Sequence, residues 1–262
     1  MKSFREKSIY IETSEGKLAA TVHFPVHWKK TFPSVLLCHG YTGSRMEQRY
    51  IFVRLSRKLA ENRIGVLRFD YLGGGESEGR FQDQTIDQYI RNASNALAYM
   101  KSLPWVDVKR TGLLGYSIGG AVAANLAKDH PELKAAVLWS PVAHPFALFF
   151  QCRPDLNPRS ILSMEEEYIE YNGWPIGLGF IRSLMGNQPV QALANYPGPV
   201  LLCHGEKDHV VPLSHSDDFT KFRDEGKTTE RVLLPESGHG YKPLVEEAKL
   251  LQETAVWFKK HL

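Results

Sequence analysis

The chain has 262 residues, of which 43% are hydrophobic and 23% charged, and its formal net charge is +3. That length suffices for a large core in a single α/β unit, and the composition is typical of a soluble globular protein. The charge is small and no basic stripe is interleaved with aromatic residues, so we predict no nucleic-acid partner.

The amino-terminal residues and the three cysteines indicate the cellular compartment of the protein. Residues 1–8 lack the apolar stretch of a secretory signal, and no apolar run is long enough to span a bilayer. Cys38, Cys152 and Cys203 form neither a disulfide framework nor a metal-binding spacing. We expect a reduced, cytoplasmic protein with no metal and no cofactor. Cys38 and Cys203 each end an apolar run, where cysteine is usually small filler; a redox pair on neighbouring strands is the alternative.

In chain order, a hairpin comes first and an alternation of strands and helices follows. Residues 8–13 and 17–24 flank a Ser-Glu-Gly turn, which is typical of an antiparallel hairpin. Near-continuous apolar runs at 34–39, 65–70, 111–116, 135–140 and 200–204 are typical of strands covered on both faces. A further strand is predicted at 230–234, and helices at 46–62, 85–103, 118–130, 214–225 and 244–261. The alternation predicts an α/β fold with a mostly parallel eight-stranded sheet and helices on both faces.

One long stretch interrupts the alternation. Residues 142–195 are rich in aromatic residues, Pro and Gly and contain no clear strand. Insertions of this length are usually lids or have structure of their own, so we predict a cap over the active site, placed after about the sixth strand. The core is then 1–141 and 196–262. Simple cap packing is the alternative role for the aromatic residues that we expect to shape an apolar substrate pocket. These are Phe146, Phe149, Phe150, Trp174 and Phe180.

A Gly-x-Ser-x-Gly string lies between a predicted buried strand and a helix of small residues. It consists of residues 115–119, with Ser117 at its centre. A sharp turn of this kind, the nucleophile elbow, holds its serine in a strained conformation and exposes the hydroxyl above the sheet. The string therefore predicts Ser117 as a nucleophile.

A serine hydroxyl needs a base within hydrogen-bond reach, and the base needs an orienting carboxylate. With this elbow the chain order is serine, acid, histidine. Asp208 stands just past the carboxyl end of a buried strand, where open α/β sheets build their sites, and we predict it as the acid; a turn aspartate is the alternative. His239 lies in a glycine-flanked loop after the next strand, and we predict it as the base.

Acyl transfer also needs donors for the developing negative charge. The N–H of Ile118, directly after the nucleophile, is one candidate. The N–H of Tyr41 is the other, because Gly40 and Gly43 let that early loop turn inward. The glycine-rich residues 72–79 do not fit a dinucleotide or P-loop pattern, and Asp70 ahead of them is predicted to hold the loop backbone.

Four strings, at residues 39–43, 68–77, 115–120 and 204–212, resemble the bacterial cinnamoyl (feruloyl) esterases of the α/β-hydrolase superfamily. The resemblance implies that fold over essentially the whole chain. It also implies the triad Ser117, Asp208 and His239, with Tyr41 and Ile118 as oxyanion donors. The chain departs from the group in having Tyr116 before the serine, where that group usually has histidine, and three glycines at 73–75 in place of Gly-His-Gly.

These features together predict a carboxylic ester hydrolase that acts through an acyl-enzyme on short-chain or aryl, cinnamoyl-type esters. Its partner would be a small-molecule ester, and the oligomeric state is left open. Two alternatives stand beside this prediction. One is a serine aminopeptidase or amidase, for which the acids at 165–167 could recognise a charged amino terminus. The other is a non-catalytic binding protein with the same fold.

Overall fold

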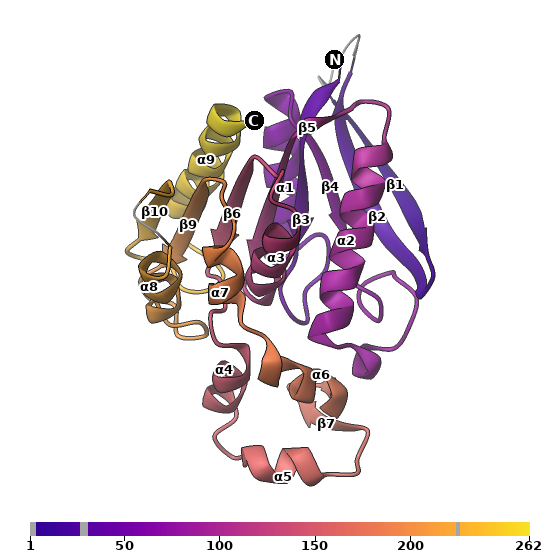
Figure 1. The fold of residues 1–262 in the computed structure, drawn as a ribbon, viewed down its shortest axis with the longest axis vertical. Coiled ribbons are helices and arrows are strands. Elements are labelled where there is room, and N and C mark those ends of the chain that lie inside the picture. The colour runs from indigo at the N-terminus through magenta and orange to yellow at the C-terminus, as the bar shows by residue number, and fades with distance from the viewer. Residues whose placement is uncertain (1–3, 27–30, 224–225) are drawn as a thin grey trace.

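One mixed sheet of eight strands forms the centre of the molecule (Figure 1). The computed structural model describes residues 4–26, 31–223 and 226–262. In pairing order the strands are β1 (Phe4–Thr13), β2 (Gly16–Pro25), β4 (Gly65–Phe69), β3 (Phe32–Cys38), β5 (Val106–Tyr116), β6 (Ala135–Trp139), β9 (Val200–Gly205) and β10 (Thr229–Leu234). The hairpin β1–β2 and the pair β2–β4 are antiparallel, and every pairing from β4 to β10 is parallel. The predicted mostly parallel sheet of eight strands is confirmed.

Helices cover both faces of the sheet, because alternate residues of each buried strand point to opposite sides. In β3, Leu36 and Cys38 join the core that contains residues of α2 and α3, whereas Val35 and Leu37 join the core that contains residues of α1 and α9. All four side chains are fully buried. The helices are α1 (Ile51–Glu61), α2 (Ile86–Ser102), α3 (Ile118–Asp129), α8 (Ser214–Lys221) and α9 (Leu244–His261).

The segment between β6 and β9 has structure of its own. Figure 1 shows α4, α5, α6 and β7 beyond one end of the sheet, while α7 packs against α3. The elements are α4 (Pro145–Cys152), α5 (Pro158–Ser163), β7 (Tyr168–Tyr171), β8 (Trp174–Gly177), α6 (Leu178–Ser183), the 3₁₀ turn η3 (Leu184–Gly186) and α7 (Pro189–Ala194). The insertion follows β6, the sixth strand in chain order. The expectation that it contains no strand is wrong, because β7 and β8 form a short antiparallel hairpin around Asn172 and Gly173.

Two predicted helices have different limits in the structure. The helix expected at 46–62 begins only at Ile51, because Glu47, Arg49 and Tyr50 have positive φ angles; a 3₁₀ turn, η1 (Gln48–Tyr50), precedes it. A second 3₁₀ turn, η2 (Phe81–Asp83), precedes α2. The helix expected at 214–225 ends at Lys221, and residues 224–225 lie outside the described residues. None of the described helices is both long and apolar enough to cross a membrane.

The cysteines act as packing groups in the sheet. Cys38 and Cys203 are free and buried, and β5 and β6 separate their strands. Burial raises the pKa of the Cys38 thiol to about 12. The alternative of a redox pair on neighbouring strands is therefore wrong, and the interpretation as apolar filler fits both residues.

Candidate active site

Ser117 stands on a sharp turn between β5 and α3. Its backbone angles, φ 57° and ψ −122°, are strained for any residue other than glycine. The turn is tight enough that a Cβ on Gly115 would lie 2.1 Å from the carbonyl oxygen of Gly119. A Cβ on Gly119 would lie 2.3 Å from the carbonyl oxygen of Cys38. Only glycine fits at these two positions, which explains their spacing around the serine.

Two hydrogen bonds connect three side chains from the loops after β5, β9 and β10. The Nε2 atom of His239 lies 3.0 Å from the hydroxyl oxygen of Ser117. The Nδ1 atom of the same ring lies 2.7 Å from an oxygen of Asp208. Because a carboxylate only accepts hydrogen bonds, Nδ1–H donates to Asp208 and Nε2 is left to accept from the serine hydroxyl. The structure thus brings together the three residues that the sequence placed far apart.

The Asp208 carboxylate is fully buried and held by several donors. One oxygen accepts hydrogen bonds from the N–H groups of Val210 and Val211, at 3.0 and 2.8 Å. The other faces His239, and it lies 3.5 Å from His204 Nε2. Burial alone would raise the pKa of Asp208, but the hydrogen bonds from His204 and His239 hold it below its usual range. Asp208 therefore stays charged at neutral pH and keeps the imidazole oriented.

His204 is a residue that the sequence patterns did not single out. It lies in β9, and its Nδ1 atom is 2.6 Å from the hydroxyl oxygen of Ser216. Its Nε2 atom is 2.8 Å from the carbonyl oxygen of Val211. His204 therefore braces the turn that carries the acid. The only available signal was its place at the end of an apolar run, four residues before Asp208.

Tyr116 holds the loop of the candidate base from the strand side. Its hydroxyl donates to the carbonyl oxygen of His239 at 2.7 Å. Its ring stacks on the imidazole of His239, with centroids 5.0 Å apart and an angle of 28° between the planes. On the other side, a guanidinium N–H of Arg49 donates to the carbonyl oxygens of Gly240 and Tyr241, at 2.7 and 2.9 Å. The imidazole is thus held at both its ring and its backbone.

The two predicted oxyanion donors border the same cavity as Ser117. Ile118 is the first residue of α3, and the first N–H groups of a helix have no acceptor within it. Tyr41 follows Gly40, on which a Cβ would lie 3.3 Å from the Cβ of Ser117. Both backbone segments therefore pass close to the serine.

Glu47 is a second residue that the sequence patterns missed. The residue lines the cavity and is almost entirely buried. The N–H of Gly40 donates to one carboxyl oxygen at 2.6 Å, and the N–H of Gln48 donates to the other at 3.2 Å. Burial raises the pKa of Glu47 to about 7, although both backbone donors lower it.

The cavity has a volume of about 750 Å³ and is bounded largely by aromatic and aliphatic side chains. Of the predicted pocket residues, Phe149, Trp174 and Phe180 line it. Phe146 and Phe150 do not; their rings pack edge to face against each other, 5.0 Å apart. A substrate in the cavity would meet aromatic surface, which suits apolar or aryl groups.

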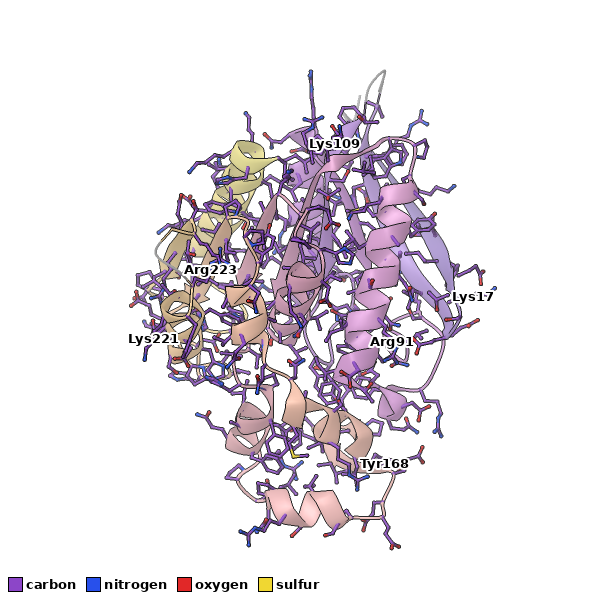
Figure 2. The ribbon with its side chains drawn as sticks, viewed as in Figure 1. Lys17, Arg91, Lys109, Tyr168, Lys221 and Arg223 are labelled. Atoms are coloured by element: carbon purple, nitrogen blue, oxygen red, sulfur yellow. The ribbon has the colours of Figure 1, made fainter. Side chains whose placement is uncertain are left out.

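Charged groups are scarce along this cavity. Among the described residues that line it there is no lysine, arginine or aspartate, and Glu47 is the one glutamate. Lys17, Lys109 and Lys221 lie at the periphery of the molecule, away from the inserted segment (Figure 2). No group of three or more His, Cys, Asp or Glu side chains in the described part of the chain could hold a metal ion.

The glycine-rich loop after β4 is held by Asp70, as its sequence suggested. The carboxylate accepts from the N–H groups of Arg45 and Glu76, at 2.6 and 3.0 Å, and also pairs with the guanidinium of Arg45. A Cβ on Gly75 would lie 2.2 Å from an Asp70 oxygen, so the glycine allows the loop to fold over the carboxylate.

Comparison with known proteins assigns the chain to a family. The model of the prolyl oligopeptidase family matches residues 57–262. The chain belongs to the prolyl oligopeptidase family. The protein Rv2307c of Mycobacterium tuberculosis (strain ATCC 25618 / H37Rv) is 28% identical over 95% of this chain and 80% of its own length. The esterase FrsA of Escherichia fergusonii is 26% identical over 88% of this chain, which spans 53% of that esterase.

Solved structures with the same fold cover nearly the whole chain. Est1E from Butyrivibrio proteoclasticus, solved with ferulic acid bound, superposes with a TM-score of 0.80 over 96% of each chain, at 24% identity. The predicted α/β-hydrolase fold is confirmed, and the protein is a hydrolase of this superfamily.

The Tyr116 hydroxyl provides a first test of the site. Replacing Tyr116 by Phe keeps the ring on His239 and removes the hydrogen bond to its carbonyl oxygen, a bond of about 1 kcal/mol. We expect hydrolysis of a p-nitrophenyl ester to slow by roughly threefold to tenfold. Tyr168→Phe, on the exposed side of β7, is the matched control and should leave the rate unchanged. Equal rates for wild type and Tyr116→Phe would contradict this role.

Glu47 provides a test through the pH dependence of stability. Its pKa is about 7 in the folded protein against an ordinary value of 4.5. The folded state therefore binds more protons than the unfolded state between these values, and the free energy of unfolding falls as pH rises through that window. Glu47→Gln removes this contribution. We expect the melting temperature of the variant, relative to wild type, to be higher at pH 8 than at pH 5; the same difference at both pH values would refute the shifted pKa.

Proposed function

We propose that this protein hydrolyses carboxylic esters with Ser117 as nucleophile, His239 as general base and Asp208 as the orienting acid. The observation that carries the proposal is the alignment of the three groups, with His239 3.0 Å from the serine oxygen and 2.7 Å from the carboxylate. A nucleophile, a base and an orienting group within hydrogen-bond reach form the arrangement that activates a serine.

In the first step, the Ser117 oxygen attacks the ester carbonyl carbon while Nε2 of His239 takes its proton. The carbonyl oxygen becomes negatively charged, and the N–H groups of Tyr41 and Ile118 stabilise it. The tetrahedral intermediate then expels the alcohol, which receives the proton from His239. The product of this step is an ester between Ser117 and the acyl group.

The second step repeats the chemistry with water. His239 takes a proton from a water molecule as that water attacks the acyl carbon. The second tetrahedral intermediate breaks its bond to Ser117, whose oxygen recovers the proton from His239. Asp208 remains charged throughout, because its buried hydrogen bonds stabilise the carboxylate, and it stabilises the imidazolium that forms twice per turnover.

We propose that residues 142–195 act as a cap and that the acyl group is apolar or aryl, as in cinnamoyl-type esters. Phe149, Trp174 and Phe180 supply the aromatic wall, and the ring of Phe180 stacks on Tyr41 with centroids 4.1 Å apart. The ferulic acid bound to Est1E supports an aryl acyl group. We further propose a cytoplasmic location, which the three free cysteines support.

A serine aminopeptidase or amidase is the second candidate, and the name of the family favours it. An aminopeptidase needs a free carboxylate to bind the charged amino terminus of its substrate. The acids at 165–167 are exposed and do not line the cavity, and Glu167 pairs with Arg80 at 2.5 Å. Both oxygens of Glu47 already accept backbone hydrogen bonds. The charges of the cavity thus favour an ester, and the complete set of three catalytic side chains argues against a non-catalytic binding protein.

Replacing Ser117 by Ala tests the proposal directly. We expect turnover of p-nitrophenyl acetate to fall by about a thousandfold or more, since the nucleophile is lost. Ser102→Ala, at the exposed last residue of α2, is the matched control and should retain full activity. Near-normal activity of Ser117→Ala would refute the mechanism.

The same assay separates the substrate classes. Acetyl, butyryl and feruloyl esters are compared with aminoacyl p-nitroanilides at equal concentration. We expect the esters to be hydrolysed, with the feruloyl ester having the lowest KM because the cavity wall is aromatic. Faster hydrolysis of the anilides would favour the peptidase.

A further inference from the structure

Residues 42–50, which run from the predicted oxyanion loop to the start of α1, have an unusual backbone. Four of these residues, none of them glycine, have positive φ angles: Thr42, Glu47, Arg49 and Tyr50. Each such residue costs free energy and persists only where its surroundings hold it in place. The contacts that hold this segment therefore indicate which function its strained backbone serves.

Two arginine side chains anchor the segment to neighbouring parts of the fold. Arg45 pairs with Asp70 in the loop after β4. Arg49 binds the backbone of Gly240 and Tyr241 and pairs with Glu247 at 2.9 Å. These anchors fix the segment to its neighbours but do not reach the backbone that faces Ser117.

Glu47 reaches that backbone. Its side chain turns back toward the start of the loop, where the N–H of Gly40 donates to it at 2.6 Å. The loop closes around the carboxylate, because a Cβ on Gly43 would lie only 2.6 Å from the same oxygen. Glu47 is 8% exposed and thus nearly inaccessible to water. Burying a carboxyl group costs free energy, which two backbone donors only partly offset.

The next peptide group is fixed from its other end. The Nδ1 atom of His39 lies 2.8 Å from the carbonyl oxygen of Gly40, which shares a planar peptide group with the N–H of Tyr41. Because that carbonyl is held by His39, the N–H of Tyr41 points the opposite way. Glu47 and His39 thus hold the two successive peptide groups that set the direction of the Tyr41 N–H.

We propose that Glu47 is a positioning residue for the oxyanion site: by accepting the Gly40 N–H, its buried side chain orients the Tyr41 N–H toward the oxygen of the reacting carbonyl. This inference rests on the proposed ester hydrolysis, and in particular on Tyr41 as a donor. Glu47 borders the cavity, but it acts through the Gly40 N–H that its oxygen accepts at 2.6 Å. Its effect is therefore confined to the transition state and to the bound tetrahedral oxygen, where the donor acts.

Three substitutions separate this role from general support of the fold. Glu47→Gln keeps an oxygen in place to accept from Gly40. Glu47→Asp keeps the carboxyl group but withdraws it by one methylene, and Glu47→Met removes the acceptor at similar size. With p-nitrophenyl acetate as substrate, we expect kcat to fall about a hundredfold in the Glu47→Met variant and about tenfold in the Glu47→Asp variant. Glu47→Gln should stay within about threefold of wild type, and KM should change less than about threefold in all three.

Asn92→Leu is the matched control. The Asn92 side chain is fully buried and accepts the N–H of Leu72 at 2.9 Å, so its loss also leaves a buried backbone donor without its acceptor. We expect Asn92→Leu to lower the melting temperature as Glu47→Met does, but to keep kcat within about twofold of wild type. Inhibition by phenylboronic acid, whose adduct with the serine places an oxygen in the oxyanion site, should weaken in proportion to kcat/KM in the Glu47 series.

The outcomes distinguish this inference from the proposed function. If wild type shows no Ser117-dependent esterase activity, the proposed function fails, and the role of Glu47 falls with it. If wild type is an esterase but Glu47→Asp and Glu47→Met match its kcat, the function stands and the inference is overturned. Should Glu47→Met not fold, the comparison of Gln with Asp decides: equal kcat in these two overturns the inference, and a clear advantage of Gln supports it.

Discussion

The close packing of α3 against β3 and β5 is the constraint on which the site depends. Gly119 lies so near the backbone of Cys38 and His39 that any side chain there would clash with their carbonyl oxygens. This contact brings the start of α3 to the end of β3, and it forces the turn between β5 and α3 into the strained conformation of Ser117. For the same reason, Ser117 borders the cavity and the predicted oxyanion loop passes beside it.

Around this turn, buried polar groups hold the other two candidate catalytic residues. Asp208 is kept ionised by backbone N–H groups and by His204, and His239 is held by Tyr116 and by its bond to Asp208. Breaking one of these hydrogen bonds would leave a buried polar group unpaired, which costs free energy. On the side of the sheet, hydrogen bonds thus hold the site in place, while the inserted segment contributes Phe149, Trp174 and Phe180 to the cavity wall.

The sequence predicted the fold because its signals are local. Apolar runs bounded by turn residues, with predicted helices between them, identified all eight strands of the central sheet. The β7–β8 hairpin was not predicted, because its strands have four residues each and form a separate sheet. Neither strand has the long apolar run of a buried strand. The start of α1 at Ile51 was not predicted, because the positive φ angles at Glu47, Arg49 and Tyr50 depend on contacts outside this short stretch.

The sequence by itself determined the elbow at Ser117, the order in which acid and histidine follow, and the parallel sheet that brings strand ends together. Those features arise from short-range patterns and from the rules of chain connection. Only the tertiary structure decided that Glu47 lies beneath the Gly40 backbone, that His204 braces Asp208, and that Phe149 lines the cavity while Phe146 does not. Such contacts join residues across the fold, and their formation depends on how the packed elements place side chains in space, which no local pattern encodes.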